Sequence, residues 1–274
     1  MGGHDDRYSH GHHASVLRSH LWRTADNSAA YLLPHLVSGV AMLDVGCGPG
    51  NLTADLARHL GSGTVVGIDR VADIVAMASH DHHATDDASS DGASLSFQVD
   101  DAYELSFADA TFDVVHAHQV LQHLTDPTAA LTEWRRVLKP GGLLAVRDTD
   151  FGAMAWGPED PVIEGWLDLY HRLTQRNGAQ ADAGRNLAGW VRAAGYQDLV
   201  VSSSNWTFHT ADDRSWWGGL WADRVVASEF GTQAVEYGLA TPEELDVIAE
   251  AFRRWADNPD GVCITVHGEV LAQA

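Results

Sequence analysis

The feature that most constrains this chain is a short apolar run that ends in a glycine-rich turn and leads into an amphipathic segment. The apolar run covers residues 40–45, the turn holds Gly46, Gly48 and Gly50, and the amphipathic segment covers residues 52–60. Glycines at such a turn permit a tight bend and let backbone N–H groups approach a ligand with no Cβ in the way. The pattern therefore predicts a β-strand, a ligand-binding turn and a helix, in that order.

The same alternation of strand and helix continues along the first half of the chain. Further β-rich runs predict strands at residues 64–68, 95–99, 112–117 and 143–147. Apolar spacing predicts the intervening helices, and a polar, aperiodic stretch at 80–93 predicts a surface loop. Strands that alternate with helices form a parallel, doubly wound sheet with helices on both faces. We therefore expect an α/β, Rossmann-like fold whose ligand binds at the carboxyl ends of the strands.

The parts of the chain before and after this alternation have different sequence patterns. A helix is expected over residues 14–37, ahead of the first strand, and eight of the ten tryptophans lie in the second half. A closing strand is expected at residues 262–271. No linker is visible that would separate a second domain, so we expect an N-terminal segment at residues 1–37 and one domain at residues 38–274.

The balance of charge disfavours two classes of partner. The chain has 38 Asp and Glu against 17 Lys and Arg, a net charge of −21 with histidine neutral. Nucleic-acid binding requires a basic surface and anionic membranes would repel this one, so no nucleic acid and no membrane is expected. No apolar stretch approaches the roughly 20 residues of a membrane span, and the N-terminus does not resemble a signal peptide. We expect a cytoplasmic monomer or homodimer that acts on a small molecule.

Two classes of ligand use a glycine turn of this kind, and its spacing favours one of them. A dinucleotide-binding turn has a third glycine at the position of Asn51, and Pro49 removes an N–H that a pyrophosphate would use. Asp44, just before the turn, suits a ligand with an ammonium group, such as the methionyl end of S-adenosylmethionine. Asp69, after the second strand, can accept from the hydroxyls of a ribose in either class. A carboxylate in the segment 100–102, after the third strand, could accept from an adenine amine.

Five motifs, in order along the chain, match one family. They read LDVGCGPG at 43–50, VVGID at 65–69, VDDA at 99–102, FDVVHAHQVLQHL at 112–124 and RRVLKPGG at 135–142. With these motifs the chain resembles the class I S-adenosylmethionine-dependent methyltransferases, nearest in style to the ubiquinone/menaquinone-biosynthesis-like small-molecule group. The resemblance covers residues 40–147. It implies a sheet of about seven strands whose last strand is antiparallel.

The resemblance also implies which residues bind S-adenosylmethionine and its product, S-adenosylhomocysteine. The turn glycines would pack on the methionyl part, Asp69 would bind the ribose, and Asp101 with Ala102 would flank the adenine. Cys47 is interpreted as a small packing residue rather than a nucleophile. The full set of predicted cofactor-binding residues is Arg23, Asp44, Gly46, Cys47, Gly48, Gly50, Asn51, Asp69, Arg70, Asp100, Asp101, Ala102, His116 and Ala117.

Methyl transfer needs alignment and exclusion of water, with a general base only when the acceptor must lose a proton. His118 and His123 follow the fourth strand and are candidates for positioning the acceptor, for base catalysis or for structural hydrogen bonds. The resemblance implies that the N-terminal segment folds over the cofactor as a lid, with Arg23 on the methionyl carboxylate. Tyr8 and His13 are then further catalytic candidates near the sulfonium.

The acceptor is expected to bind among helical cap elements in about 148–185 and 209–258. Three tryptophans at positions 216, 217 and 221 could line a pocket for a planar acceptor or belong to an ordinary core. Asp148 and Asp150 are candidates for the same cavity. No metal site is predicted, because the histidine clusters around residues 10–13 and 80–83 lack the i, i+4 spacing of a helical zinc motif.

These expectations combine into one function and two alternatives. The function is transfer of a methyl group to carbon, oxygen, nitrogen or sulfur of a hydrophobic, aromatic or indolic small molecule, in secondary or cofactor metabolism. The first alternative is a protein that binds a nucleoside cofactor without catalysis. The second is a nicotinamide-dependent oxidoreductase, against which the spacing of the turn argues.

Overall fold

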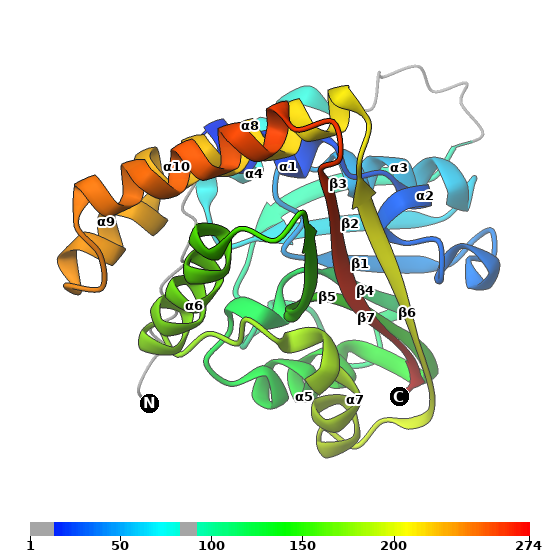
Figure 1. Ribbon diagram of the computed structural model, residues 1–274. Coiled ribbons are helices and arrows are strands. Elements are labelled where there is room, and N and C mark those ends of the chain that lie inside the picture. The colour runs from blue at the N-terminus through cyan, green and yellow to red at the C-terminus, as the bar shows by residue number, and fades with distance from the viewer. Residues whose placement is uncertain (1–13, 83–91) are drawn as a thin grey trace.

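The computed structural model describes residues 14–82 and 92–274, which form a seven-stranded mixed sheet (Figure 1). The strands are β1 (Ala41–Val45), β2 (Thr64–Asp69), β3 (Ser94–Val99), β4 (Phe112–His118), β5 (Leu138–Gly157), β6 (Gln197–Phe208) and β7 (Val262–Gln273). They lie in the order β3-β2-β1-β4-β5-β7-β6. The pairs from β3 to β5 are parallel, whereas β7 is antiparallel to both of its neighbours. The prediction of a Rossmann-like sheet with an antiparallel last strand is confirmed.

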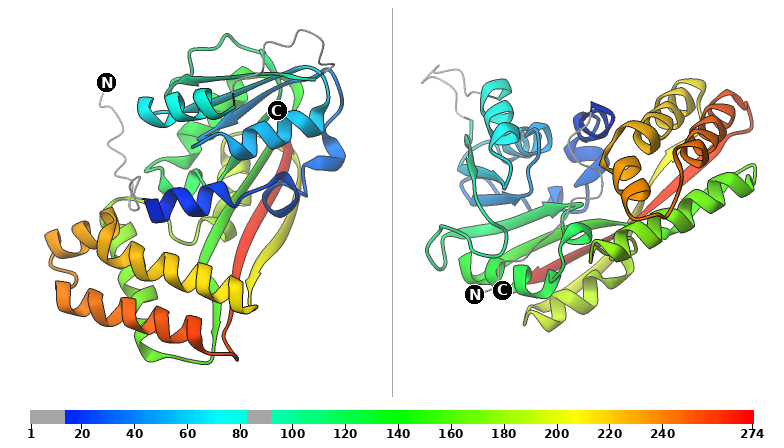
Figure 2. Two further views of the ribbon diagram at one scale, coloured as in Figure 1. Left: turned by 90° about the horizontal axis from the view of Figure 1, so that it is seen from above. Right: turned by 90° about the vertical axis from the view of Figure 1, so that its left-hand side faces the viewer.

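Helices cover both faces of this sheet (Figures 1 and 2). The helical elements of the described residues are α1 (Ala14–Leu21), α2 (Ala25–Ser28), η1 (Leu33–His35), α3 (Asn51–Leu60), α4 (Ala72–Asp81), η2 (Leu121–His123), α5 (Pro127–Val137), α6 (Pro161–Arg176), α7 (Ala183–Ala193), α8 (Ala211–Ala227), α9 (Glu229–Glu236) and α10 (Pro242–Asp257). Leu43 and Val45 of β1 share a buried cluster with α5 and α7, whereas Met42 shares one with α2 and α3. Alternate residues of one strand are therefore buried on opposite faces, which explains the continuous apolar runs in the sequence.

The N-terminal helix expected over residues 14–37 is interrupted, so that prediction is wrong. Thr24 and Asn27 form a capping box: each side chain accepts a hydrogen bond from the backbone N–H of the other residue. The residue that caps a new helix has an extended backbone, so the preceding helix cannot continue through Thr24. Pro34 then lies in the short turn η1. The segment is consequently divided into α1, α2 and η1.

β5 is much longer than the strand expected at residues 143–147. It has 20 residues and follows α5 directly, with an irregularity in its pairing between Asp150 and Ala155. Beyond this irregularity β5 still pairs with β7, where Trp156 lies opposite Cys263. The extended part of β5, together with β7 and β6, reaches past the other strands of the sheet and supports the cap helices (Figure 2).

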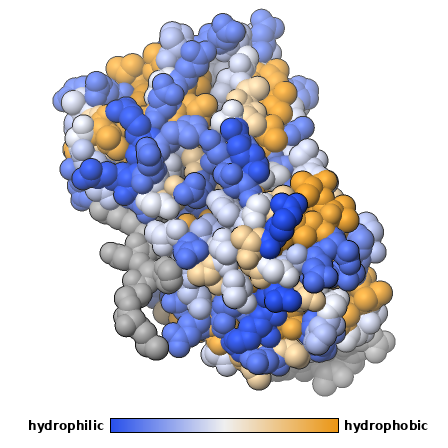
Figure 3. Space-filling model, turned by 90° about the horizontal axis from the view of Figure 1, so that it is seen from below, coloured by the Kyte–Doolittle hydropathy of each residue, from blue (hydrophilic) through white to orange (hydrophobic). Residues whose placement is uncertain are grey.

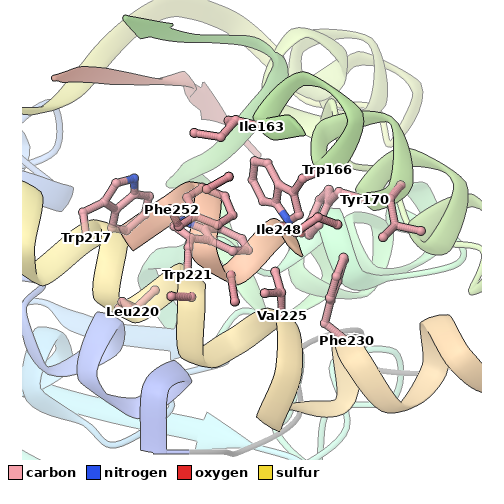
Figure 4. Close-up of a cluster of buried hydrophobic side chains, with 14 of the residues drawn as sticks. Ile163, Trp166, Tyr170, Trp217, Leu220, Trp221, Val225, Phe230, Ile248 and Phe252 are labelled. Atoms are coloured by element: carbon pink, nitrogen blue, oxygen red, sulfur yellow. The ribbon is translucent and has the colours of Figure 1, made fainter. Parts of the chain in front are cut away.

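The cap consists of α6, α8, α9 and α10, which enclose an apolar core together with residues of β5, β6 and β7 (Figures 1 and 4). Trp166 of α6 meets Trp221 of α8 and Phe252 of α10, with ring centroids 4.5 Å and 5.1 Å away. These helices fall within the two ranges in which cap elements are expected. The division into a segment at 1–37 and a domain at 38–274 stays a prediction.

The surface is chemically mixed. Figure 3 shows the face seen from below, on which hydrophobic residues lie in several groups between hydrophilic ones. Val200 and Val201 of the edge strand β6 are more than half exposed, at 61% and 59%. Within the described ranges, no helix combines the length and the apolar character needed to cross a membrane.

Candidate active site

The glycine turn between β1 and α3 has a backbone that only glycine adopts readily. The φ angles are +70°, +55° and +82° at Gly46, Gly48 and Gly50. A Cβ on Gly46 would lie 2.4 Å from Cγ2 of Val120, and one on Gly50 would lie 2.7 Å from the ring of Phe97. At Gly48 the nearest atom of the described residues is 3.4 Å away. Gly46 and Gly50 therefore permit close packing behind the turn, whereas a Cβ on Gly48 would only touch the ring of His20.

A cavity of about 470 Å³ lies in front of this turn, at the carboxyl ends of β1, β2 and β4. This is the switch point of the sheet, where the chain leaves β1 toward β2 on one side and reaches β4 on the other. One end of the cavity is lined by the turn and by the carboxylates of Asp69, Asp100 and Asp101. The opposite end is lined by aromatic side chains from the α1–α2 connection, β6 and α8.

The carboxylates at the turn end are held by backbone N–H groups. Asp69 accepts hydrogen bonds from the N–H of Gly48 at 3.2 Å and of Val71 at 3.0 Å. Asp101 accepts from the N–H of Tyr103 at 2.9 Å. An ionised carboxylate has about four acceptor sites, so each can still accept from the hydroxyl or amine of a ligand. The arrangement fits a ribose at Asp69 and an amine near Asp101.

Asp44 lies behind the turn and is bonded within the protein. Its Oδ1 lies 2.7 Å from Nδ1 of His116, and its Oδ2 accepts from the hydroxyl of Thr53. Asp44 and Cys47 line a second hollow of about 20 Å³ beside the turn. Burial raises the pKa of the Cys47 thiol well above its usual range, so this cysteine is an inert thiol.

Asn51 connects the turn to the N-terminal segment. Its side-chain amide donates to the carbonyl oxygens of His20 at 2.9 Å and Arg23 at 2.7 Å. A glycine at this position, as in a dinucleotide-binding turn, could make neither bond. Asn51 thus fastens the α1–α2 connection over the glycine turn.

The predicted cofactor-binding residues fall into three groups. Those that line the main cavity are Arg23, Gly46, Gly48, Asp69, Arg70, Asp100, Asp101 and Ala102. Those that line only the smaller hollow are Asp44, Cys47 and Asn51. Those that line neither are Gly50, His116 and Ala117.

Two histidines, His118 buried and His123 half-buried, line the cavity. His118 ends β4 and is 4% exposed, and its Nε2 has no hydrogen-bond partner among the described residues. Burial and the positive charges of Arg23 and Arg147 lower its pKa well below the usual range. His123 lies in η2, and burial followed by the charges of Arg23 and Arg224 lowers its pKa to about 3. Both imidazoles are therefore neutral near neutral pH, and a neutral imidazole can accept a proton.

Gln119 connects the N-terminal segment to the sheet, and its importance was missed in the sequence. Its side-chain oxygen accepts from Arg23 at 2.6 Å, and its amide nitrogen lies 2.7 Å from Oγ1 of Thr149 and 2.9 Å from Nε2 of His267. Its φ is +56°, an unusual value for a residue other than glycine. Such strain at a cavity wall is typical of a functional position. The only local signal is its place directly after His118.

The aromatic end of the cavity resolves the two interpretations of the tryptophan cluster. Trp216, Trp217 and Trp221 all line the cavity. Trp217 and Trp221 are at the same time nearly fully buried and belong to the cap core (Figure 4). Trp22 closes this end, since its ring centroid lies 5.1 Å from that of Trp206 and 5.4 Å from that of Trp216. The tryptophans are thus both pocket wall and core.

The other residues that the sequence suggested for the site either do not line the cavity or lie outside the described residues. Asp148 and Asp150 do not line the cavity, so the expectation that they face it is wrong. Asp148 is fully buried and accepts from the N–H of Gln122, whereas Asp150 is paired with Arg185. Tyr8 and His13 lie outside the described residues, as do the histidines at 10, 12 and 83. Within the described ranges, no three His, Cys, Asp or Glu side chains group as metal ligands.

A glycine turn that fronts a cavity, with carboxylates at the next two strand ends, defines a nucleoside-binding α/β domain. Residues 43–146 match the family model described as a methyltransferase domain. An uncharacterised methyltransferase of Schizosaccharomyces pombe is 30% identical over 268 residues, 96% of this chain and 95% of its own length. A probable methyltransferase of Aspergillus luteorubrus is 28% identical over 98% of both chains.

A solved structure shares the fold. It is phosphoethanolamine N-methyltransferase 2 of Haemonchus contortus, with a TM-score of 0.55 and 18% identity over 89% of this chain and 52% of that one. The chain belongs to the class I S-adenosylmethionine-dependent methyltransferases, so S-adenosylmethionine is its methyl donor. The residues present fit that cofactor, because the glycine turn and the carboxylates of Asp69, Asp100 and Asp101 line the same end of the cavity.

Proposed function

We propose that this methyltransferase acts on a hydrophobic, aromatic small molecule that binds at the tryptophan end of the cavity. The observation that carries the proposal is the continuity of one cavity from the glycine turn to Trp216, Trp217 and Trp221. A cofactor at the turn and a planar molecule between the tryptophans would then share one cavity. Aromatic walls bind planar acceptors by stacking and by displacing water. An indole is one ring system of suitable shape.

The cofactor-binding roles follow from the placement of the side chains. We assign the methionyl part to the turn at Gly46 and Gly48, its carboxylate to Arg23, the ribose to Asp69 and the adenine to Asp101 with Ala102. When bound, S-adenosylmethionine supplies an electrophilic methyl group on a positively charged sulfur. The protein positions the two reactants and keeps water out, and alignment of this kind contributes much of the rate.

His118 is the residue best placed to handle a proton of the acceptor. Its Nε2 has no partner within the described part of the chain, and its imidazole is neutral. It can therefore position a hydroxyl or amine of the acceptor through a hydrogen bond, whereas its lowered pKa makes it a weak base. His123 contacts the side chain of Gln122 at 3.1 Å, which favours a positioning role. Tyr8 and His13 stay candidates on the sequence alone.

The charge of the chain supports a small-molecule acceptor. A net charge of −21 would repel nucleic acids, and the proposed site is a cavity of about 470 Å³, a volume suited to a small molecule. We propose a setting in secondary or cofactor metabolism, in the cytoplasm, as a monomer or homodimer. The atom methylated can be carbon, oxygen, nitrogen or sulfur.

Calorimetry and mass spectrometry test this function together. S-Adenosylhomocysteine should bind the protein and NAD should not; the reverse result would favour an oxidoreductase. Aromatic metabolites incubated with S-adenosylmethionine should include one that gains the mass of one methylene. Tight binding of S-adenosylhomocysteine with no methylated product across the panel would favour the non-catalytic alternative.

A further inference from the structure

One side chain in the wall of the cavity has an oxygen that the protein leaves unpaired. Gln122 of η2 lines the cavity and is 5% exposed. Its side-chain oxygen Oε1 has no hydrogen-bond partner among the described residues. A buried acceptor without a donor is unfavourable, and most such groups in folded proteins are paired. The oxygen is therefore a group that a ligand of the cavity can satisfy.

The rest of Gln122 is held by hydrogen bonds. Its backbone N–H donates to Oδ1 of Asp148 at 3.2 Å, and its carbonyl oxygen accepts from the N–H of Gln180 at 2.8 Å. Its side-chain nitrogen lies 3.1 Å from Nε2 of His123. Because burial lowers the pKa of His123 to about 3, its imidazole is neutral and can accept from this nitrogen. These contacts hold the amide in one orientation, with its nitrogen on His123 and its oxygen without a partner.

Gln122 lies where the sheet meets the cap. Gln180, which bonds to it, is followed by Ala181, whose carbonyl oxygen accepts from the N–H of Phe151 at 3.2 Å. Phe151 also lines the cavity, and its ring centroid lies 6.3 Å from that of Trp221. Gln122 is thus joined through two short backbone links to the aromatic wall of the acceptor end.

We propose that the acceptor carries a neutral hydrogen-bond donor on its aromatic ring, such as a ring N–H, and that Gln122 accepts a hydrogen bond from it. The inference rests on the proposed function, since it concerns the acceptor of the same cavity. An amide oxygen accepts but cannot donate, so it selects a donor. It also carries no charge, so it would not compensate a buried ammonium group. A ring without a donor would leave the oxygen unpaired and bind less tightly.

Gln122 also supports the wall of the cavity, and this role must be separated from ligand binding. A substitution keeps its two backbone bonds but can remove the side-chain contact with His123. Loss of a purely structural glutamine would weaken all ligands of the cavity alike. A preference for one ring over another of the same shape is therefore the informative measurement.

The experiment compares three ligands of one shape. Indole, indene and benzofuran differ at a single ring position, which holds N–H, CH₂ and oxygen respectively. Each is titrated by calorimetry, near neutral pH, into protein saturated with S-adenosylhomocysteine. The wild-type protein should bind indole about tenfold more tightly than indene, the effect of one buried hydrogen bond, and benzofuran no more tightly than indene. Gln122→Met should abolish the preference for indole, and Gln122→Glu, which keeps an oxygen acceptor, should retain part of it.

Gln180→Met is the matched control, because it makes the same substitution at a neighbouring glutamine. Gln180 bonds to Gln122 through its backbone, but it is exposed and does not line the cavity. This variant should keep the full tenfold preference. The wild-type comparison and Gln122→Glu remain decisive if Gln122→Met does not fold.

Three results would overturn the inference in distinguishable ways. Equal affinity of the wild type for indole and indene would refute the donor on the acceptor ring and leave the aromatic acceptor intact. An unchanged preference for indole in Gln122→Met would remove Gln122 from the site. Absence of binding by all three ligands would contradict the aromatic acceptor of the proposed function itself.

Discussion

At the scale of the residue, the role of Asp69 can be tested most directly. Its carboxylate accepts hydrogen bonds both from Gly48 in the glycine turn and from Val71, after β2. Asp69→Ala removes the proposed acceptor for the ribose hydroxyls and also the bonds to the N–H groups of Gly48 and Val71. We expect the affinity for S-adenosylhomocysteine to fall about tenfold or more, measured by calorimetry. Asp73→Ala, at an exposed position of α4, is the control and should bind as the wild type does. Unchanged affinity of Asp69→Ala would mean that the ribose lies elsewhere.

Asp148 gives a prediction on stability and pH. Burial raises the pKa of its carboxyl to about 7, whereas in the unfolded chain it is about 3.9. At a pH between about 3.9 and about 7, the carboxyl of Asp148 keeps its proton in the folded protein but loses it in the unfolded chain. The free energy of unfolding should therefore fall as pH rises through this window, by at most about 1.4 kcal/mol per pH unit from this group, and then level off.

Asp148→Asn isolates this contribution. Asparagine does not titrate, and its carbonyl oxygen can still accept from the N–H of Gln122. Chemical unfolding of both proteins at a series of pH values should show the variant gaining stability relative to the wild type as pH rises from about 4 to about 7. A constant difference between the two proteins over that range would refute the raised pKa.

At the scale of the element, the contact between α8 and α10 depends on one glycine. A Cβ on Gly218 would lie 2.8 Å from the carbonyl oxygen of Phe252 and 2.9 Å from Cβ of Ala256, whereas a Cβ on Gly219 would have no atom within 4 Å. Gly218→Ala should force the helices apart and cost about 1–3 kcal/mol of unfolding free energy. Gly219→Ala should raise the free energy of unfolding by about 0.5–1 kcal/mol, because alanine is the better helix former. Equal effects of the two substitutions, measured by denaturant unfolding, would contradict this packing.

The elements that could be predicted are those whose signal is local. β1 to β4 and α3 are short units bounded by glycine, proline or a cap, and their bounds match the predicted ones within about two residues. β5 was predicted too short, because Pro140, Gly141 and Gly142 read as the end of a structure. In the folded chain Gly141 and Gly142 instead bond to the backbone of Ala274, at the far end of the sequence. No local pattern encodes such a pairing.

The residues of the site also fall into those that a local sequence signal marks and those that only tertiary packing brings together. The turn glycines and Asp69 stand at strand ends that the sequence marks, so they could be placed in advance. Gln119 and His267 are 148 residues apart and come together because β7 inserts between β5 and β6. Arg224 faces the cavity because α8 folds back over α1. These residues depend on tertiary packing, which the sequence does not display residue by residue.

At the scale of the whole molecule, the sheet and the cap line different ends of one cavity. The sheet presents the glycine turn and carboxylates at its switch point, and the cap and the α1–α2 connection supply the aromatic wall. Asn51 bonds to the backbone carbonyl of Arg23 and Gln119 to its side chain, so both hold the N-terminal segment at the site. The cavity is therefore assembled by parts of the chain that are distant in sequence.

The central claim, methyl transfer to a small molecule, is tested most directly by following the methyl group. The protein is incubated with methyl-labelled S-adenosylmethionine and an extract of its native cells, and the products are separated by size. The label should appear in a small aromatic compound, above the amount found without added protein. Label confined to nucleic acid or protein, or no transfer beyond that of the extract alone, would contradict the account.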